Sequence, residues 1–173
     1  FRSVARAGLS AEQRQAIEHV TGPQRIAAVV GFAGAGKSTM LAAAREAWEA
    51  EGRRVFGAAL AGKAAEGLEE SAAIQSRTLA SWERRWAQGP DLLDTGDVLV
   101  IDEAGMVGSR QLAGFVAEVD RRGAKLVLVG DHEQLQAIAA GAPFRAIAEQ
   151  VGHIELQEIR RQREDWQRAA SVA

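Results

Sequence analysis

The sequence of 173 residues contains no cysteine. Disulfide bonds and thiolate metal sites are therefore excluded, and the composition is consistent with a reducing cytoplasm. No apolar run approaches the roughly eighteen residues that a membrane-spanning helix needs, and Phe1-Arg2-Ser3 resembles no signal peptide. The histidines, His19, His132 and His153, are too far apart in the sequence to suggest a metal-binding cluster.

The chain also lacks an excess of positive charge. Its 21 Lys and Arg residues against 23 Asp and Glu residues give a formal net charge of −2. Any contact with DNA would therefore have to come from a local patch. The length fits one domain with its own core. Because the chain begins with Phe1 and not with Met, we expect it to be a piece of a longer protein.

Short apolar runs alternate along the chain with amphipathic helical patterns. Uninterrupted apolar runs of this length are typical of strands that are covered on both faces. They lie at residues 26–30, 55–60, 98–101 and 126–129. Helical patterns lie at residues 40–48, 112–119 and 144–151. The alternation predicts a three-layer α/β fold with a mainly parallel central sheet.

The segment from Gly31 to Thr39 reads GFAGAGKST and lies between the first strand and the first helical pattern. It matches the phosphate loop G-x-x-x-x-G-K-[ST], whose glycines let successive N–H groups point at a polyphosphate. Lys37 would reach the outer phosphates, and Ser38 would supply a hydroxyl ligand for Mg²⁺. The alternative is a glycine-rich turn that only joins a strand to a helix. The predicted nucleotide contacts are completed by Gly34, Ala35, Gly36 and Thr39.

Asp102 and Glu103 follow directly on the apolar run at 98–101. Ligands of open α/β sheets bind at the carboxyl ends of the strands, so both carboxylates are expected near the phosphate loop. Asp102 would hold the Mg²⁺ shell, and Glu103 would orient and deprotonate an attacking water. The alternative is that the two carboxylates only cap the next helix.

The next apolar run, 126–129, ends in the polar segment GDHEQLQ at residues 130–136. Gln134 in this segment could hydrogen-bond the γ-phosphate and move the adjoining loop when that phosphate leaves. A polar surface loop is the alternative interpretation.

In this order, the segments LSAEQRQAI, GFAGAGKST, VLVIDEAGMV, LVLVGDHEQLQAI and IELQEIRRQ resemble the first motor subdomain of superfamily-one, RecD-like helicases. The resemblance extends from about Leu9 to Gln162. More narrowly, the chain is similar to the helicase region of TraA-type conjugative relaxases. The resemblance implies a RecA-like P-loop NTPase fold, ATP and Mg²⁺ as cofactors, and an ATP-dependent helicase that acts in conjugative DNA transfer.

The resemblance also assigns roles to three residues outside the phosphate loop. It implies that Gln13 reads the adenine, that Gln134 senses the γ-phosphate, and that Arg161 contacts the γ-phosphate. Ser10 and Gln13 also match a helix capping box, and both roles of Gln13 could coexist. The alternative for Arg161 is an exposed arginine at a helix end.

Single-stranded DNA is the partner that the resemblance implies. The matching segments are 60–65 and 76–79, which makes Lys63, Arg77 and Thr78 the candidate DNA contacts. Trp82 and Trp86 share a helical face with Leu79, a pattern that favours core packing over base stacking.

The sequence departs from the helicase pattern in two respects. It ends soon after Arg161, so we expect the second RecA-like half of the motor to be absent and the chain alone to be weak or inactive. Ala137 also stands where many relatives carry proline. A small-molecule phosphotransferase and a nucleotide-dependent interaction module that does not hydrolyse ATP are the competing interpretations.

Overall fold

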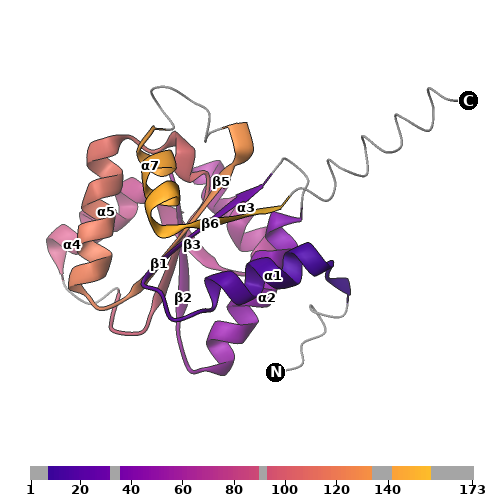
Figure 1. The fold of residues 1–173 in the computed structure, drawn as a ribbon. Helices are drawn as coiled ribbons and strands as arrows, with labels where there is room; N and C mark the ends of the chain where they lie inside the picture. Colours follow the sequence, from indigo (N-terminus) through magenta and orange to yellow (C-terminus); the bar gives the residue numbers. More distant parts are fainter. Residues whose placement is uncertain (1–7, 32–35, 90–92, 134–141, 157–173) are drawn as a thin grey trace, which may run out of the picture.

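The computed structural model describes residues 8–31, 36–89, 93–133 and 142–156. Within these ranges, helices cover both faces of one six-stranded parallel sheet (Figure 1), which confirms the predicted three-layer α/β fold. The strands are β1 (Ile26–Gly31), β2 (Val55–Ala59), β3 (Gln75–Thr78), β4 (Val98–Ile101), β5 (Lys125–Asp131) and β6 (His153–Leu156). The helices are α1 (Ala11–Val20), α2 (Lys37–Ala50), α3 (Gly62–Ala72), α4 (Leu79–Gln88), α5 (Ser109–Arg121), α7 (Ala142–Val151) and the short 3₁₀ helix η2 (Ala104–Met106).

The sheet has the strand order β3-β2-β4-β5-β1-β6, and all neighbouring strands run parallel. The four strands predicted from the apolar runs occupy its four central positions. Residues Ala27 to Val30 of β1 are at most 1% exposed, as are residues 98–101 of β4. Both faces of these strands are covered by helices, so neither face carries side chains that contact water. Their sequences are therefore uninterrupted apolar runs.

The two edge strands were not predicted. β3 has the sequence QSRT and pairs with β2, and β6 has the sequence HIEL and pairs with β1. Each edge strand has a neighbour on one side only and keeps partly exposed side chains. Their sequences therefore lack the apolar signal that marks the central strands.

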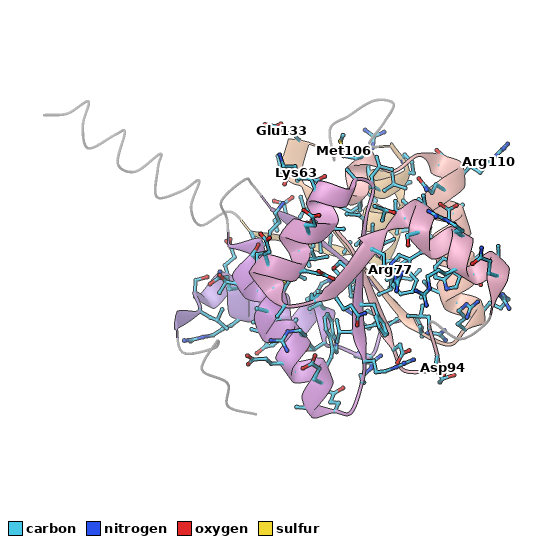
Figure 2. All side chains as sticks on the ribbon, turned by 180° about the vertical axis from the view of Figure 1, so that it is seen from behind. Lys63, Arg77, Asp94, Met106, Arg110 and Glu133 are labelled. Atoms are coloured by element: carbon cyan, nitrogen blue, oxygen red, sulfur yellow. The ribbon has the colours of Figure 1, made fainter. Side chains whose placement is uncertain are left out.

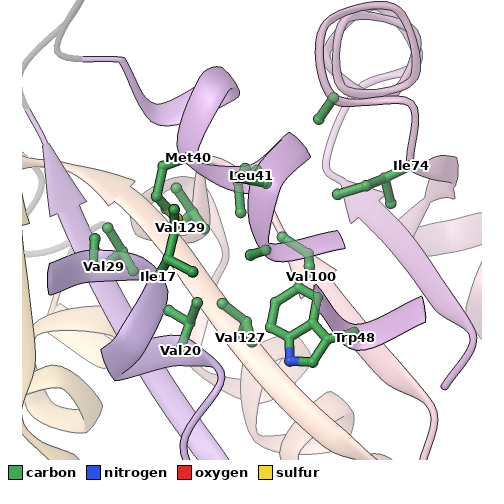
Figure 3. Close-up of a cluster of buried hydrophobic side chains, with 14 of the residues drawn as sticks. Ile17, Val20, Val29, Met40, Leu41, Trp48, Ile74, Val100, Val127 and Val129 are labelled. Carbon is green, nitrogen blue, oxygen red and sulfur yellow. The ribbon is translucent and has the colours of Figure 1, made fainter. Parts of the chain in front are cut away.

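The sheet separates two apolar cores. Helices α1, α2 and α3 enclose the first core, where Val127 of β5 lies beside Trp48 of α2 and Val129 of β5 lies near Met40 (Figure 3). Helices α4, α5 and α7 enclose the second core, which contains Leu126 and Leu128 from the same strand. This alternation follows from the opposite directions of successive side chains in a strand. No helix in the described ranges is both long and apolar enough to cross a membrane.

Trp82 belongs to the second core and is 1% exposed. Its indole N–H donates a hydrogen bond of 2.9 Å to the carbonyl oxygen of Gly57 in β2. Trp86 packs beside it, with 5.5 Å between the ring centroids. The interpretation of these tryptophans as packing residues is therefore confirmed for Trp82. Gly57 is required at this point, because an added Cβ would lie 2.6 Å from a methyl carbon of Leu68.

Two basic side chains anchor the connection between α1 and β1 at the amino edge of the sheet. Lys125 Nζ donates to the carbonyl oxygen of Gly22 over 2.7 Å, and Arg25 Nε donates to that of Ala124 over 3.3 Å. Lys125 is 2% exposed, and its burial, with a smaller effect of Arg53, lowers its pKa to about 8. These contacts hold α1 in place beside α2.

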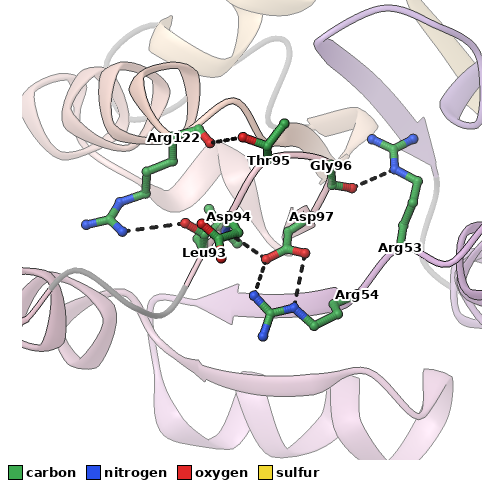
Figure 4. Close-up of polar contacts among 8 residues, drawn as sticks. All are labelled: Arg53, Arg54, Leu93, Asp94, Thr95, Gly96, Asp97 and Arg122. Carbon is green, nitrogen blue, oxygen red and sulfur yellow. Dashed lines mark hydrogen bonds and ion pairs between the residues drawn. The ribbon is translucent and has the colours of Figure 1, made fainter.

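Asp97 organises the turn that leads into β4 (Figure 4). Its carboxylate is bound by Arg54, with Nη2 to Oδ2 at 2.6 Å and Nε to Oδ1 at 3.2 Å. The backbone N–H of Asp94 donates to the same Oδ2 over 2.8 Å. Asp97 is 4% exposed, so its charge is stabilised by these donors and little by water.

We expect Asp97→Ala to lower the free energy of unfolding by about 1 to 3 kcal/mol, because the backbone N–H of Asp94 and the guanidinium of Arg54 lose their acceptor. Urea unfolding at neutral pH measures this change. Asp120→Ala is the matched control, since Asp120 pairs with Arg25 at 3.5 Å while the two side chains are 75% and 54% exposed. The control should cost less than about 0.5 kcal/mol. Equal losses in the two variants would contradict the structural role of Asp97.

Candidate nucleotide-binding site

Three neighbouring strands deliver polar groups to one edge of the sheet. β1, β5 and β4 are adjacent, and the register places Gly31 of β1 beside Asp131 of β5. Asp102 follows β4 directly, and Lys37 begins the helix that follows β1. Parallel strands have all their carboxyl ends on the same side, so the predicted phosphate and metal residues meet there.

Gly36 has a backbone conformation that favours glycine. Its φ and ψ angles are 82° and 25°, in the left-handed region, directly before the first turn of α2. A Cβ at this position would also lie 2.2 Å from Nε2 of Gln13. Glycine has no side chain with which to cap α2, so the first N–H groups of this helix remain available to an anion.

Lys37 forms an ion pair with Asp131. Nζ of Lys37 donates to Oδ1 of Asp131, and the two side chains are 20% and 41% exposed. The lysine stem passes over the end of β1, because a Cβ on Gly31 would lie 3.1 Å from both Cγ and Cδ of Lys37. The ammonium group is therefore directed at the sheet edge where the carboxylates are.

Asp102 is a desolvated carboxylate. Burial is the largest influence and raises its pKa above the usual value, while the backbone N–H of Glu103 and the charge of Lys37 oppose the increase. That N–H donates to Oδ1 of Asp102 over 2.9 Å. A carboxylate with little water around it is stabilised by a nearby cation, which suits the predicted metal role.

Glu103 is exposed and adopts a left-handed backbone conformation, with φ 52° and ψ 42°. Such a conformation costs on the order of 1 kcal/mol for a residue that is not glycine. The Glu103 side chain makes no capping hydrogen bond to η2, which begins at the next residue. The capping alternative is therefore not supported for Glu103, whose carboxylate stays accessible at the sheet edge.

Gln13 contacts the phosphate loop. Its side chain completes a capping box with Ser10, in which Ser10 Oγ accepts from Gln13 N at 3.0 Å and Gln13 Oε1 accepts from Ser10 N at 2.9 Å. The remaining amide nitrogen, Nε2, donates to the carbonyl oxygen of Gly36 over 3.1 Å. One glutamine therefore joins the start of α1 to the start of α2, and the capping role is confirmed.

Ser38 and Thr39 are exposed in the first turn of α2. Their hydroxyl groups are accessible from solvent, as a metal or phosphate ligand requires. Four other residues of the predicted site, Gly34, Ala35, Gln134 and Arg161, lie outside the described residues.

The candidate DNA contacts lie on α3 and β3, on the side of the sheet where β3 is the edge strand (Figure 2). Lys63 is exposed in the first turn of α3, and Arg77 is half-buried on the edge strand β3. Neither forms an ion pair within the described ranges. Thr78 has a structural role, because its hydroxyl accepts from Ser81 N at 3.1 Å and caps α4.

Asp131 is the site residue that sequence reasoning did not single out. Its signal was present, since it follows an apolar run and lies in the polar segment 130–136 in which Gln134 was predicted. The pairing with Lys37 depends on the adjacency of β1 and β5 in the sheet, because Lys37 and Asp131 are 94 positions apart in the sequence.

The chain matches a known protein family. A family model described as an AAA domain matches residues 8–173. The chain is 67% identical over 164 residues to the conjugal transfer protein TraA of Rhizobium radiobacter, and the match covers 95% of this chain and 15% of that protein. It is 34% identical over 165 residues to the ATP-dependent RecD2 DNA helicase of Deinococcus radiodurans, covering 91% of this chain and 22% of that protein. The chain thus spans less than a quarter of the length of either relative.

A solved structure has a similar fold. The Pif1 helicase of a Bacteroides species in complex with ADP-AlF4 superposes with a TM-score of 0.55 at 19% identity, over 86% of this chain and 41% of that chain. Similarity at this identity concerns the fold alone, and it agrees with the RecA-like layers described above. The chain therefore belongs to the AAA domain family, and its similarity to TraA and RecD2 confirms the predicted resemblance to RecD-like helicase motor domains.

Proposed function

We propose that this chain is the ATP-binding and ATP-hydrolysing motor subdomain of a DNA helicase that acts in conjugative DNA transfer, in the cytoplasm. The observation that carries the proposal is the meeting of Lys37, Asp102 and Asp131 at one sheet edge, beside the uncapped start of α2. The 67% identity to a conjugal transfer protein supports the biological setting.

The residues present fit a magnesium nucleotide. No cluster of three or more His, Cys, Asp or Glu side chains in the described ranges could hold a metal ion by itself. Mg²⁺ bound to nucleotides commonly takes only one or two protein ligands and several phosphate oxygens and waters. Ser38 and Asp102 would be those ligands here, and the ion would neutralise charge on the phosphates during transfer.

Different side chains would bind the phosphates and activate the attacking water. Lys37 and the first N–H groups of α2 would bind the phosphates, and Glu103 would accept a proton from the attacking water. Gln13, which contacts Gly36 O, would reach the adenine as well. Gln134 as γ-phosphate sensor and Arg161 as γ-phosphate ligand remain proposals that rest on the resemblance.

The DNA would bind across the carboxyl edge of the sheet. Lys63 and Arg77 would contact phosphates of single-stranded DNA, and Thr78 would contribute through the N-terminal region of α4 that it caps. A second RecA-like half in the same protein would close against this half when ATP binds and open after hydrolysis, moving the strand.

Two other functions use the same loop and make different predictions. A small-molecule phosphotransferase would transfer the γ-phosphate to a substrate other than water. An interaction module would bind ATP without turning it over, with or without the second half. The accessible carboxylate of Glu103 suits water activation, and measurement of released phosphate distinguishes the three.

Lys37→Ala should weaken ATP binding by about 1.5 to 3 kcal/mol, because a charge-assisted contact to the phosphates is lost. A titration of a fluorescent ATP analogue in the presence of Mg²⁺ measures the loss. Arg110→Ala is the matched control, since Arg110 is an exposed cation on α5 (Figure 2) that should not affect affinity. Equal affinity of the Lys37→Ala and unmodified proteins would remove the phosphate loop from the proposal.

Glu103→Gln should leave ATP binding unchanged and slow hydrolysis on the order of a hundredfold or more, because the amide keeps the size of the side chain but cannot accept the proton. The rate is measured in a version of the protein that includes the second half. Asp102→Asn should instead change the Mg²⁺ dependence of binding. Wild-type turnover in the Glu103→Gln protein would show that Glu103 is not the base.

The 173-residue chain alone should bind nucleotide with little or no unwinding activity. Positioned arginines contribute about 10³ to 10⁵ in rate in related phosphoryl transfers, and we propose that one of them comes from the second half. DNA binding should be weak, with a shallow salt dependence, because few phosphate contacts are available. Unwinding of a tailed duplex and DNA-stimulated ATPase are compared with those of the longer protein. Robust unwinding by the 173-residue chain would disprove the proposal that a second RecA-like half is needed for unwinding.

A further inference from the structure

The carboxylate of Asp131 accepts a hydrogen bond from the Lys37 ammonium group, the group that is proposed to bind phosphate. The ammonium group of Lys37 has Asp131 as an ion-pair partner, and its side chain is only 20% exposed. Asp102 interacts electrostatically with both groups. An ammonium group has three N–H donors, and a highly charged polyphosphate is a strong competitor for them.

The pair also joins two elements that the chain keeps far apart. Lys37 is the first residue of α2, and Asp131 is the last residue of β5. The lysine stem reaches Asp131 by passing over Gly31, the register partner of Asp131. Loss of the pair would therefore remove a side-chain link between the start of α2 and the end of β5 without breaking any hydrogen bond of the sheet.

We propose that Asp131 is a positioning residue that holds the Lys37 ammonium group toward the sheet edge and is exchanged for phosphate when nucleotide binds. The exchange lowers the apparent nucleotide affinity, and it releases the Asp131 carboxylate from Lys37 each time the phosphate site fills. This inference rests on the proposed nucleotide site and adds a residue to it. It makes the end of β5 respond to the phosphates through Lys37.

Asp131→Asn is the primary test, because asparagine keeps the shape and removes the charge. The chain should bind both Mg²⁺-ATP and inorganic tripolyphosphate about threefold to fivefold more tightly, near the upper end of the range for an ion pair that is partly exposed. Asp131→Glu keeps the charge and should return the affinity toward the wild-type value. Calorimetric titration of both ligands gives the dissociation constants, and thermal melting verifies that each variant is folded.

Two controls separate this exchange from a general effect of charge. Glu133→Gln removes the same charge from an exposed residue two positions further along the chain (Figure 2) and should change affinity less than about twofold. In a Lys37→Ala background, Asp131→Asn should have no effect, since the competition requires the ammonium group. Tightening that persists without Lys37, or that Glu133→Gln reproduces, would overturn the exchange. So would weaker binding by Asp131→Asn, the result expected if Asp131 helps to hold Mg²⁺.

The unmodified chain offers a second readout that does not depend on folding of a variant. The ¹³C resonance of the Asp131 carboxyl group should shift when tripolyphosphate saturates the site, and the shift should be much smaller in Lys37→Ala. A resonance that does not move on saturation would also overturn the exchange. If the wild-type chain binds neither ATP nor tripolyphosphate, the proposed nucleotide site itself is wrong. Binding by the wild type with no difference in Asp131→Asn refutes only the role of Asp131.

Discussion

All neighbouring strands of the sheet pair in parallel, and the positions of the polar groups follow from this pairing. Each central strand is covered on both faces, so its residues must be apolar, and functional polar groups can be placed only where the strands end. Parallel direction brings all carboxyl ends to one edge. Lys37, Asp102 and Asp131 come from distant parts of the chain and still meet, because β1, β5 and β4 are neighbours in the sheet.

The polar residues at the amino edge and at the carboxyl edge of the sheet have different roles. At the amino edge, Asp97 with Arg54 and Lys125 with Gly22 make hydrogen bonds that hold turns to the sheet. At the carboxyl edge, two residues have unfavourable local features. Burial raises the pKa of Asp102, and Glu103 has a left-handed backbone conformation. Unfavourable local features of this kind are tolerated where the surrounding fold is stable, and they concentrate at functional sites.

Gln13 links the stability of the fold to the candidate site. Three of its polar atoms are used within the chain, two in the capping box of α1 and one in the contact with Gly36 O. Helix α1 is in turn anchored at its other end through Gly22 and Lys125. Helix α1 therefore holds Gly36, directly before α2, from outside the sheet.

The central strands, and the position of Asp102 and Glu103 directly after β4, could be predicted from the sequence because each depends on local composition and spacing. The 3.6-residue period at Leu112, Phe115 and Val119 likewise predicted α5 correctly. Tertiary structure alone decided the edge strands β3 and β6, whose pairing comes from a neighbour and not from apolar residues. It also decided the ion pair of Lys37 with Asp131, because a contact across 94 residues depends on strand order, which no local pattern encodes.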